Sequence, residues 1–265
     1  MNITSKDSFW FWSAGIAVLL VGAGIVSYLY YEYGRGSAEV APAAAPPPAV
    51  SAPAATEPAP APPAPAPVAR ATPLPNLDES DAEVVSGLTE LVGHDALQQL
   101  LVPQRIIRNV VVTIDNLPRQ KVAVNQRPIK PTPGKFLVTG SEDAHEIAAE
   151  NYMRYAPFVA VVKRIDAQTL VAFYRGLQPL FQQAYEELGN PNGSFNTRLL
   201  EVIDHLLQTP DVAQSPRLVQ PSVVYKYSDA QLEGRSAGQK LLIRMGPANA
   251  GVMKAKLREI RSALG

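Results

Sequence analysis

The stretch SFNTRLLEVIDHLL, residues 194–207, indicates a helical fold. Its apolar residues recur every three or four positions, so they share one face of an α-helix: Phe195, Leu199, Val202, Ile203 and Leu206. Ser194 stands directly before this pattern, where its side chain can accept a hydrogen bond from the first turn. The segment therefore predicts a capped helix with one buried face.

Helices are predicted on the N-terminal side of this stretch as well. Ser80-Asp81-Ala82-Glu83 has the sequence of a capping box, and it opens a helix that Gly93 ends. A second helix is predicted to start at Pro103, a suitable first-turn residue, and to end at Asn116-Leu117-Pro118. Two more are predicted nearer to residue 194, over 150–163 and, after the cap Asp166, over 167–188, with kinks at Pro157 and Pro179.

On the C-terminal side, helices are predicted from Ser236 to Met245 and from Pro247 to the end of the chain, separated by Gly246. Two short strands are predicted, over 135–138, paired with a segment near Glu146-Ile147, and over 222–227. The chain has no cysteine, so disulfides cannot stabilise it. The predicted fold class is mostly α with a minor β element, in one globular domain over residues 76–265.

Toward the N-terminus, a run of 23 residues from Phe9 to Tyr31 contains no charged residue. A helix of this length crosses a hydrocarbon core of about 30 Å. Aromatic residues cluster at both ends of the run, as they do at the two surfaces of a bilayer. A cleaved signal peptide is the alternative, but its apolar region is shorter, about 7 to 15 residues. We therefore predict a retained transmembrane helix over residues 9–33.

Between this helix and the domain, the composition changes to alanine and proline. Thirteen of the 25 prolines lie in residues 38–75. Proline lacks a backbone donor and favours extended polyproline II, so residues 34–75 are predicted to be a disordered linker. Its full reach is on the order of 100 Å.

The charges that flank the predicted helix set its orientation. Lys6 and the free amino group oppose only Arg35, which places residues 1–8 in the cytoplasm and the domain outside it. This layout is typical of single-pass proteins of the bacterial inner membrane with a periplasmic domain. Ala23 and Ser27 form a small-xxx-small pair that allows a homodimer through the membrane.

Several long segments of the domain resemble a known family. They include NLPR (residues 116–119), PLFQQAYEELG (179–189), FNTRLLEVIDHLL (195–207), LVQPSVVYKY (218–227) and SAGQKLLIRMGPANAGVMKAKLREIR (236–261). These resemble the bacterial domain-of-unknown-function family 3014 over nearly all of residues 83–265. The resemblance implies a proteobacterial envelope protein with an anchor, a stalk and a domain, and it implies no activity.

The residues themselves point to no enzyme class. The three histidines lie far apart and outside any HExxH, GxSxG or P-loop motif. Glu201 and His205 share a helix face, but two ligands do not make a metal site, and a solvated ion pair is the simpler interpretation. Gly238-Gln239-Lys240 resembles the end of a phosphate-binding loop, yet Leu241 replaces the required Ser or Thr. We therefore expect no catalytic residue, metal or cofactor.

A binding surface is the stronger hypothesis, because the formal net charge of zero hides a basic C-terminal segment. Lys254, Arg258 and Arg261 recur on one stripe of the last helix, which would suit an anionic surface. The full set of candidate binding residues is Arg198, Glu201, His205, Lys240, Arg244, Lys254, Arg258 and Arg261. The alternative is that the stripe faces water or pairs with acidic residues near 78–90.

Together these patterns predict a membrane-anchored periplasmic binding or scaffold domain. Its expected partners are the inner membrane, through residues 9–31, and a periplasmic protein or anionic envelope polymer. Nucleic acid is not expected outside the cytoplasm. The alternative function is an envelope hydrolase or transferase of an undescribed type.

Overall fold

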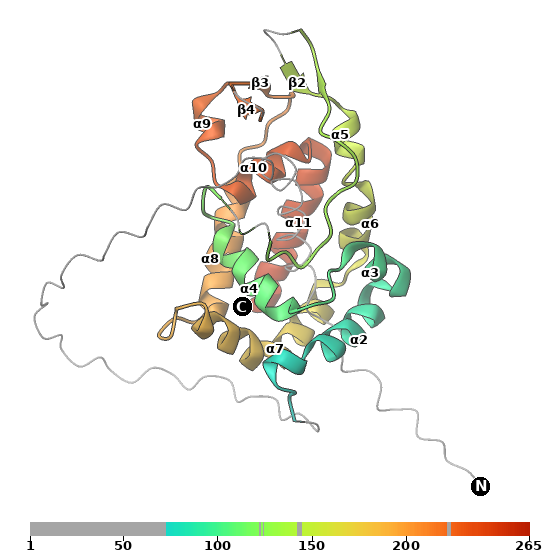
Figure 1. Cartoon of the computed structure of the whole chain (residues 1–265), viewed down its shortest axis with the longest axis vertical. Coiled ribbons are helices and arrows are strands. Elements are labelled where there is room, and N and C mark those ends of the chain that lie inside the picture. The colour runs from blue at the N-terminus through green and yellow to red at the C-terminus, as the bar shows by residue number, and fades with distance from the viewer. Residues whose placement is uncertain (1–72, 122, 124, 142–144, 222–223) are drawn as a thin grey trace, which may run out of the picture.

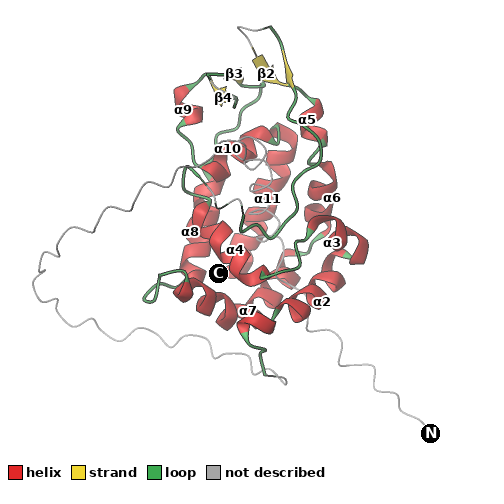
Figure 2. Ribbon diagram, viewed as in Figure 1, coloured by secondary structure: helices red, strands yellow, loops and turns green. Residues whose placement is uncertain are grey.

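The computed structural model describes residues 73–265, except 122, 124, 142–144 and 222–223. This part forms a mostly helical domain with a small antiparallel sheet at one end (Figures 1 and 2), which confirms the predicted fold class for it. The predicted transmembrane helix, and the linker up to residue 72, lie outside the described residues. Among those that are described, none of the helices has the length and apolar character that a membrane span requires.

The helices are η1 (Leu77–Glu79), α2 (Asp81–Val92), α3 (His94–Leu100), α4 (Ile106–Asn116), α5 (Glu150–Met153), α6 (Ala156–Arg164), α7 (Ala167–Glu187), α8 (Phe195–Leu207), α9 (Ala230–Glu233), α10 (Ala237–Arg244) and α11 (Pro247–Leu264). The strands are β1 (Val138–Thr139), β2 (His145–Ile147), β3 (Arg217–Val219) and β4 (Lys226–Tyr227).

The last helix, α11, lies in the middle of the fold and packs against α6, α7, α8 and α10. Helix α4 packs against α7 and α8 and completes the main core. Where α7 meets α8, aromatic rings interlock, and Phe181 stacks on Phe195 with ring centroids 5.6 Å apart. The predicted inner face of residues 194–207 is buried as expected, because these rings and α11 cover it.

The sheet has the strand order β1-β2-β3-β4, and every neighbouring pair is antiparallel. The predicted pairing of the first strand with the segment near Ile147 is confirmed, since Val138 lies opposite Ile147. A second small core lies beneath the sheet, where Ile147, Leu218 and Tyr227 pack with Ile243 of α10. The sheet is thus attached to the helical core through α10.

Long cationic side chains close the C-terminal ends of several helices. Lys256 Nζ donates to Ile165 O after α6 (2.7 Å), and Lys254 Nζ donates to Thr209 O after α8 (2.5 Å). Lys240 Nζ donates to Glu233 O at the end of α9 (3.1 Å). The last carbonyls of a helix lack intrahelical partners and carry partial negative charge, so a cation stabilises them. All three lysines are buried and have structural roles.

Two predicted caps at helix N-termini, Asp166 and Ser194, are confirmed, and Ser236, which was predicted only as the start of its helix, is a third cap. The side chains of Asp166, Ser194 and Ser236 accept hydrogen bonds from the backbone N–H groups three residues later. Hydrogen bonds from the Thr169 side chain and backbone lower the pKa of Asp166. The two predicted caps are local, so sequence spacing alone was sufficient to identify them.

The predicted capping box at Ser80 is wrong. The Ser80 hydroxyl donates to Leu77 O, at 2.7 Å, and caps nothing in α2. Asp81 instead caps a different helix, because its carboxylate accepts from the backbone N–H groups of Arg105 and Ile106, at 2.7 and 2.8 Å. These bonds fix the start of α4 at Ile106, three residues after the predicted start.

Other boundaries also differ from the prediction. The single helix expected over 150–163 is two, α5 and α6, because Pro157 lies in the first turn of α6, where its missing N–H costs no hydrogen bond. The strand expected over 135–138 begins at Val138, and of 222–227 only Lys226–Tyr227 is a strand. Helix α3 and strand β3 were not predicted.

Candidate functional site

A group of polar contacts lies where the turn after α4 meets the start of α10. Ala237 N donates to Arg119 O at 2.8 Å, and Gly238 N donates to Leu117 O at 3.0 Å. A Cβ atom on Gly238 would lie 2.5 Å from Leu206 Cδ2 and 3.1 Å from Leu117 O. The close contact between these segments therefore depends on glycine at position 238. We call this region, formed by the turn after α4, α8 and the start of α10, the junction.

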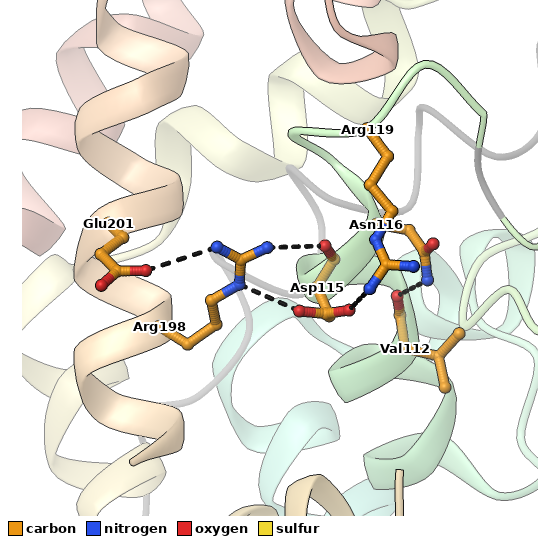
Figure 3. A network of polar contacts seen from close by, with 6 residues as sticks. All are labelled: Val112, Asp115, Asn116, Arg119, Arg198 and Glu201. Carbon is orange, nitrogen blue, oxygen red and sulfur yellow. Dashed lines mark hydrogen bonds and ion pairs between the residues drawn. The ribbon is translucent and has the colours of Figure 1, made fainter. Parts of the chain in front are cut away.

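Asp115 is the centre of the junction. Its buried carboxylate accepts from Arg119 Nη2 at 2.5 Å and from Arg198 Nε at 3.0 Å, as Figure 3 shows. Arg198 Nη2 also donates to the backbone carbonyl of Asp115 at 3.0 Å. Arg198 thus joins α8 to α4, Arg119 ties the following turn to the same carboxylate, and the two guanidinium groups compensate for its removal from water. Burial, followed by the charge of Asp115, raises the pKa of nearby Tyr185.

Glu201 lies at the solvent edge of this network. It accepts from Arg198 Nη1 at 3.3 Å, and its side chain is 60% exposed (Figure 3). The expected ion pair between Glu201 and His205 is therefore wrong, since each of these residues contacts a different partner. Such an exposed contact adds little stability, about 0 to 1 kcal/mol.

His205 contacts the start of α10. Its Nε2 lies 2.9 Å from the buried Ser236 Oγ, which also accepts from Gln239 N at 3.3 Å. Burial lowers the pKa of His205, and the charges of Arg198 and Arg235 lower it further. The ring is therefore neutral at pH 7, and the Ser236 hydroxyl can donate to Nε2 while it accepts from the backbone.

The basic residues predicted on one stripe of α11 do not form a common surface. Lys254 is 4% exposed and donates to Asp211 Oδ1 at 2.6 Å, which lowers the pKa of Asp211. Arg261 pairs with Asp204 at 3.0 Å, and only Arg258 is largely exposed. Neither acid belongs to the acidic segment near 78–90, so that alternative is also wrong.

The two candidates on α10 are also buried. Lys240 pairs with Glu233 at 3.1 Å. The Arg244 guanidinium carbon lies 5.2 Å from the centre of the Tyr227 ring, a cation–π distance. Among the eight candidate residues, the structure brings Arg198, Glu201 and His205 together at the junction.

Three residues of the junction were absent from the candidate set: Asp115, Arg119 and Ser236. Asp115 had a signal in the sequence, because it lies four residues after Val111 on the apolar side of its helix, where an acid needs a partner. Its partner Arg198 is 83 residues away, so no local pattern could have identified the pair.

Two cavities found in the core of the described residues are small and apolar. Their volumes are about 20 and 10 Å³, and they are lined by residues such as Tyr174 and Leu264, and Leu97 and Ile129. Within residues 73–265, apart from 122, 124, 142–144 and 222–223, no three His, Asp or Glu side chains are grouped to hold a metal ion.

Comparison with known proteins yields one family. Residues 106–261 match the family described as "Protein of unknown function (DUF3014)". This range runs from the first residue of α4 to within α11 and includes every residue of the junction. No curated protein and no solved structure matches the chain.

Proposed function

We propose, from the premise that this chain belongs to the DUF3014 family of proteins of unknown function, that it is a membrane-anchored protein of the bacterial envelope. In this proposal, residues 9–33 cross the inner membrane and residues 34–75 form a spacer. The helical domain acts in the periplasm as a binding or scaffold domain.

The order of segments along the chain carries this proposal. A charge-free run of 23 residues is followed by the segment with 13 prolines, and then by a packed domain. Packing begins at the end of the proline-rich segment, where Leu74 contacts the main core, and continues at the buried Leu77. An anchor, a spacer and a compact domain together suit a protein that presents a surface at a distance from the bilayer.

The junction supports binding over catalysis. Asp115 and Arg198 join α4 to α8, and Ser236 caps α10 while it contacts His205. These side chains therefore already have structural partners within the fold. The exposed edge of the junction is the part that remains available for a partner.

A reporter fusion tests the location. A reporter enzyme that is active only after export, fused after Gly265, should be active in cells that express the full chain. The same fusion without residues 9–31 should be inactive. Activity of a cytoplasmic reporter at the same position would contradict the proposal. Affinity capture from intact envelopes should then recover a specific partner.

One observation favours the alternative, an envelope hydrolase or transferase. The 2.9 Å contact between His205 Nε2 and Ser236 Oγ has the geometry of a base and a nucleophile. A fluorophosphonate probe, which labels activated serines, distinguishes the two functions. The binding proposal expects no labelling in the native chain. Labelling that Ser236→Ala abolishes and Ser194→Ala preserves would establish the enzyme.

A further inference from the structure

An exposed cationic surface lies at the edge of the junction. The turn after α4 and the segment before α10 run side by side, because Ala237 N donates to Arg119 O and Gln120 Nε2 donates to Gly234 O, both at 2.8 Å. Arg119 has a 61% exposed side chain, Lys121 is exposed, and Arg235 is half-buried. We call Arg119, Lys121 and Arg235 the cationic surface.

The acids at the junction do not balance these charges. Asp115 is shared between Arg119 and Arg198, and Glu201 contacts Arg198. Arg119, Arg198, Arg235 and Lys121 therefore carry four positive charges beside two carboxylates, which leaves an excess of two. The nearby acids Glu233 and Asp204 are paired with Lys240 and Arg261.

Two of the cations have no partner. Neither the Arg235 guanidinium nor the Lys121 ammonium makes a hydrogen bond or ion pair within the part of the chain that the structure describes. A guanidinium offers a planar set of donors that suits a phosphate or carboxylate. The surface is thus cationic and retains unused donors.

We infer that the cationic surface binds a phosphate group, either free or as a monoester on a larger molecule. A phosphate monoester carries about −1.5 to −2 charges at pH 7, which matches the excess of two, whereas a carboxylate supplies one. This inference rests on the proposed function, because it specifies the partner chemistry of the same binding domain.

His205 provides a reporter for this site. It lies beside Arg198 and Glu201 on α8 and contacts Ser236, the residue after Arg235. A bound dianion would offset the positive charges that lower the His205 pKa, so phosphate should raise it. His94 in α3 and His145 in β2 are internal controls in the same sample.

The experiment is NMR of the detergent-solubilised full chain, labelled with ¹³C at histidine Cε1. The three histidine pKa values are measured with inorganic phosphate, glycerol phosphate or acetate at equal ionic strength. Both phosphates should raise the His205 pKa and leave His94 and His145 unchanged. Acetate should bind at least tenfold more weakly. A stronger effect of the ester identifies a phosphate carried on a larger molecule, and a stronger effect of inorganic phosphate identifies the free ion.

Matched variants locate the site. Arg235→Gln should abolish the phosphate-induced change in the His205 pKa, and Lys121→Gln should weaken it. Arg164→Gln removes an exposed cation at the end of α6 and should leave the change intact. An equal shift of all three histidines, an equal effect of acetate, or an unchanged response of Arg235→Gln would overturn the inference.

This test and the reporter test fail independently. A His205 response in a chain whose C-terminus lies in the cytoplasm would overturn only the proposed function. A periplasmic domain whose His205 does not respond to phosphate would overturn only the phosphate site.

Discussion

The sequence predicts that Lys254 lies on an exposed binding surface, but in the structure it is buried and stabilises the fold. It belongs to a regular basic stripe, yet it is 4% exposed and donates to Thr209 O beyond the end of α8. A stripe of basic residues along a helix indicates an exposed surface only if no neighbouring helix covers that side. Helix α11 has α6, α7, α8 and α10 around it, so periodicity could not show which of its charges reach solvent.

Lys254→Met should destabilise the domain by about 1 to 3 kcal/mol, because it leaves the buried Thr209 carbonyl without its donor. Arg258→Met, one turn away on the same helix and exposed, should change stability by about 0.5 kcal/mol or less. Thermal unfolding of the full chain measures both. Equal effects of the two variants would show that Lys254 is not a structural cap.

The second prediction at this scale concerns pH. Because burial lowers the His205 pKa in the folded state, the unfolded chain binds a proton more readily below its ordinary value near 6.5. Stability should therefore fall as pH falls from 7.5 to 5.5, and it should be level above that window. Arg198, Arg235 and Glu201 are the charged groups around the ring.

In His205→Gln, the melting temperature should depend less on pH between 7.5 and 5.5. In His94→Gln, which changes an exposed residue, the melting temperature should keep the pH dependence of the native chain. The measurement is the melting temperature at several pH values for the three proteins. An identical slope in His205→Gln would assign the pH dependence to other groups.

At the scale of elements, the attachment of α10 depends on backbone contact. Gly238 allows the start of this helix to approach Leu117 O and Leu206, and the second core then connects α10 to the sheet. Displacement of this one helix would disturb both the junction and the sheet.

Gly238→Ala should therefore destabilise the domain by about 1 to 3 kcal/mol, since the added Cβ would lie 2.5 Å from Leu206 Cδ2. Gly251→Ala is the matched control in α11, where nothing lies within 4 Å of the new atom. It should stabilise by about 0.5 to 1 kcal/mol, because alanine is the better helix former. Denaturant unfolding compares the two, and a stabilising Gly238→Ala would disprove the close contact.

Prediction from sequence succeeded for the longer helices with one apolar face, such as α7 and α8, because periodicity and a local cap both identify them. Gly93 ends α2 as predicted, but α3 was missed because the chain starts another helix directly after this glycine. The strands have only two or three residues, so tertiary pairing defines them. The contact between α4 and α10 joins distant segments and has no local signal.

For the whole molecule, the described structure places η1 and α2 at one end and the sheet at the other (Figure 1). Residue 73, the first described residue, precedes η1, so a chain tethered through its N-terminal side would carry the sheet at its far end. The proposed spacer determines how far the domain lies from the bilayer, and the fold determines which end faces away from it.

Elastase, which cleaves after small residues, should cut the native full chain between residues 38 and 75 and leave a stable fragment. The fragment should unfold cooperatively at the same temperature as the full chain, because we expect the part of the spacer before residue 73 to add no packing to the core. A heat-treated sample is the control and should be digested completely. Early cleavage inside residues 76–265, or a lower melting temperature of the fragment, would contradict separate folding.

The lysines that donate to the C-terminal ends of the helices affect when the chain can complete its fold during synthesis. Lys240 lies in α10, and Lys254 and Lys256 lie in α11, yet they complete helices that the ribosome made earlier, including α6, which ends at Arg164. Helix α11, which packs against α6, α7, α8 and α10, is synthesised after all four of them. A nascent chain thus cannot finish its core before α11 has been synthesised. Premature stop codons anywhere upstream of Lys254 should yield polypeptides that quality-control proteases degrade.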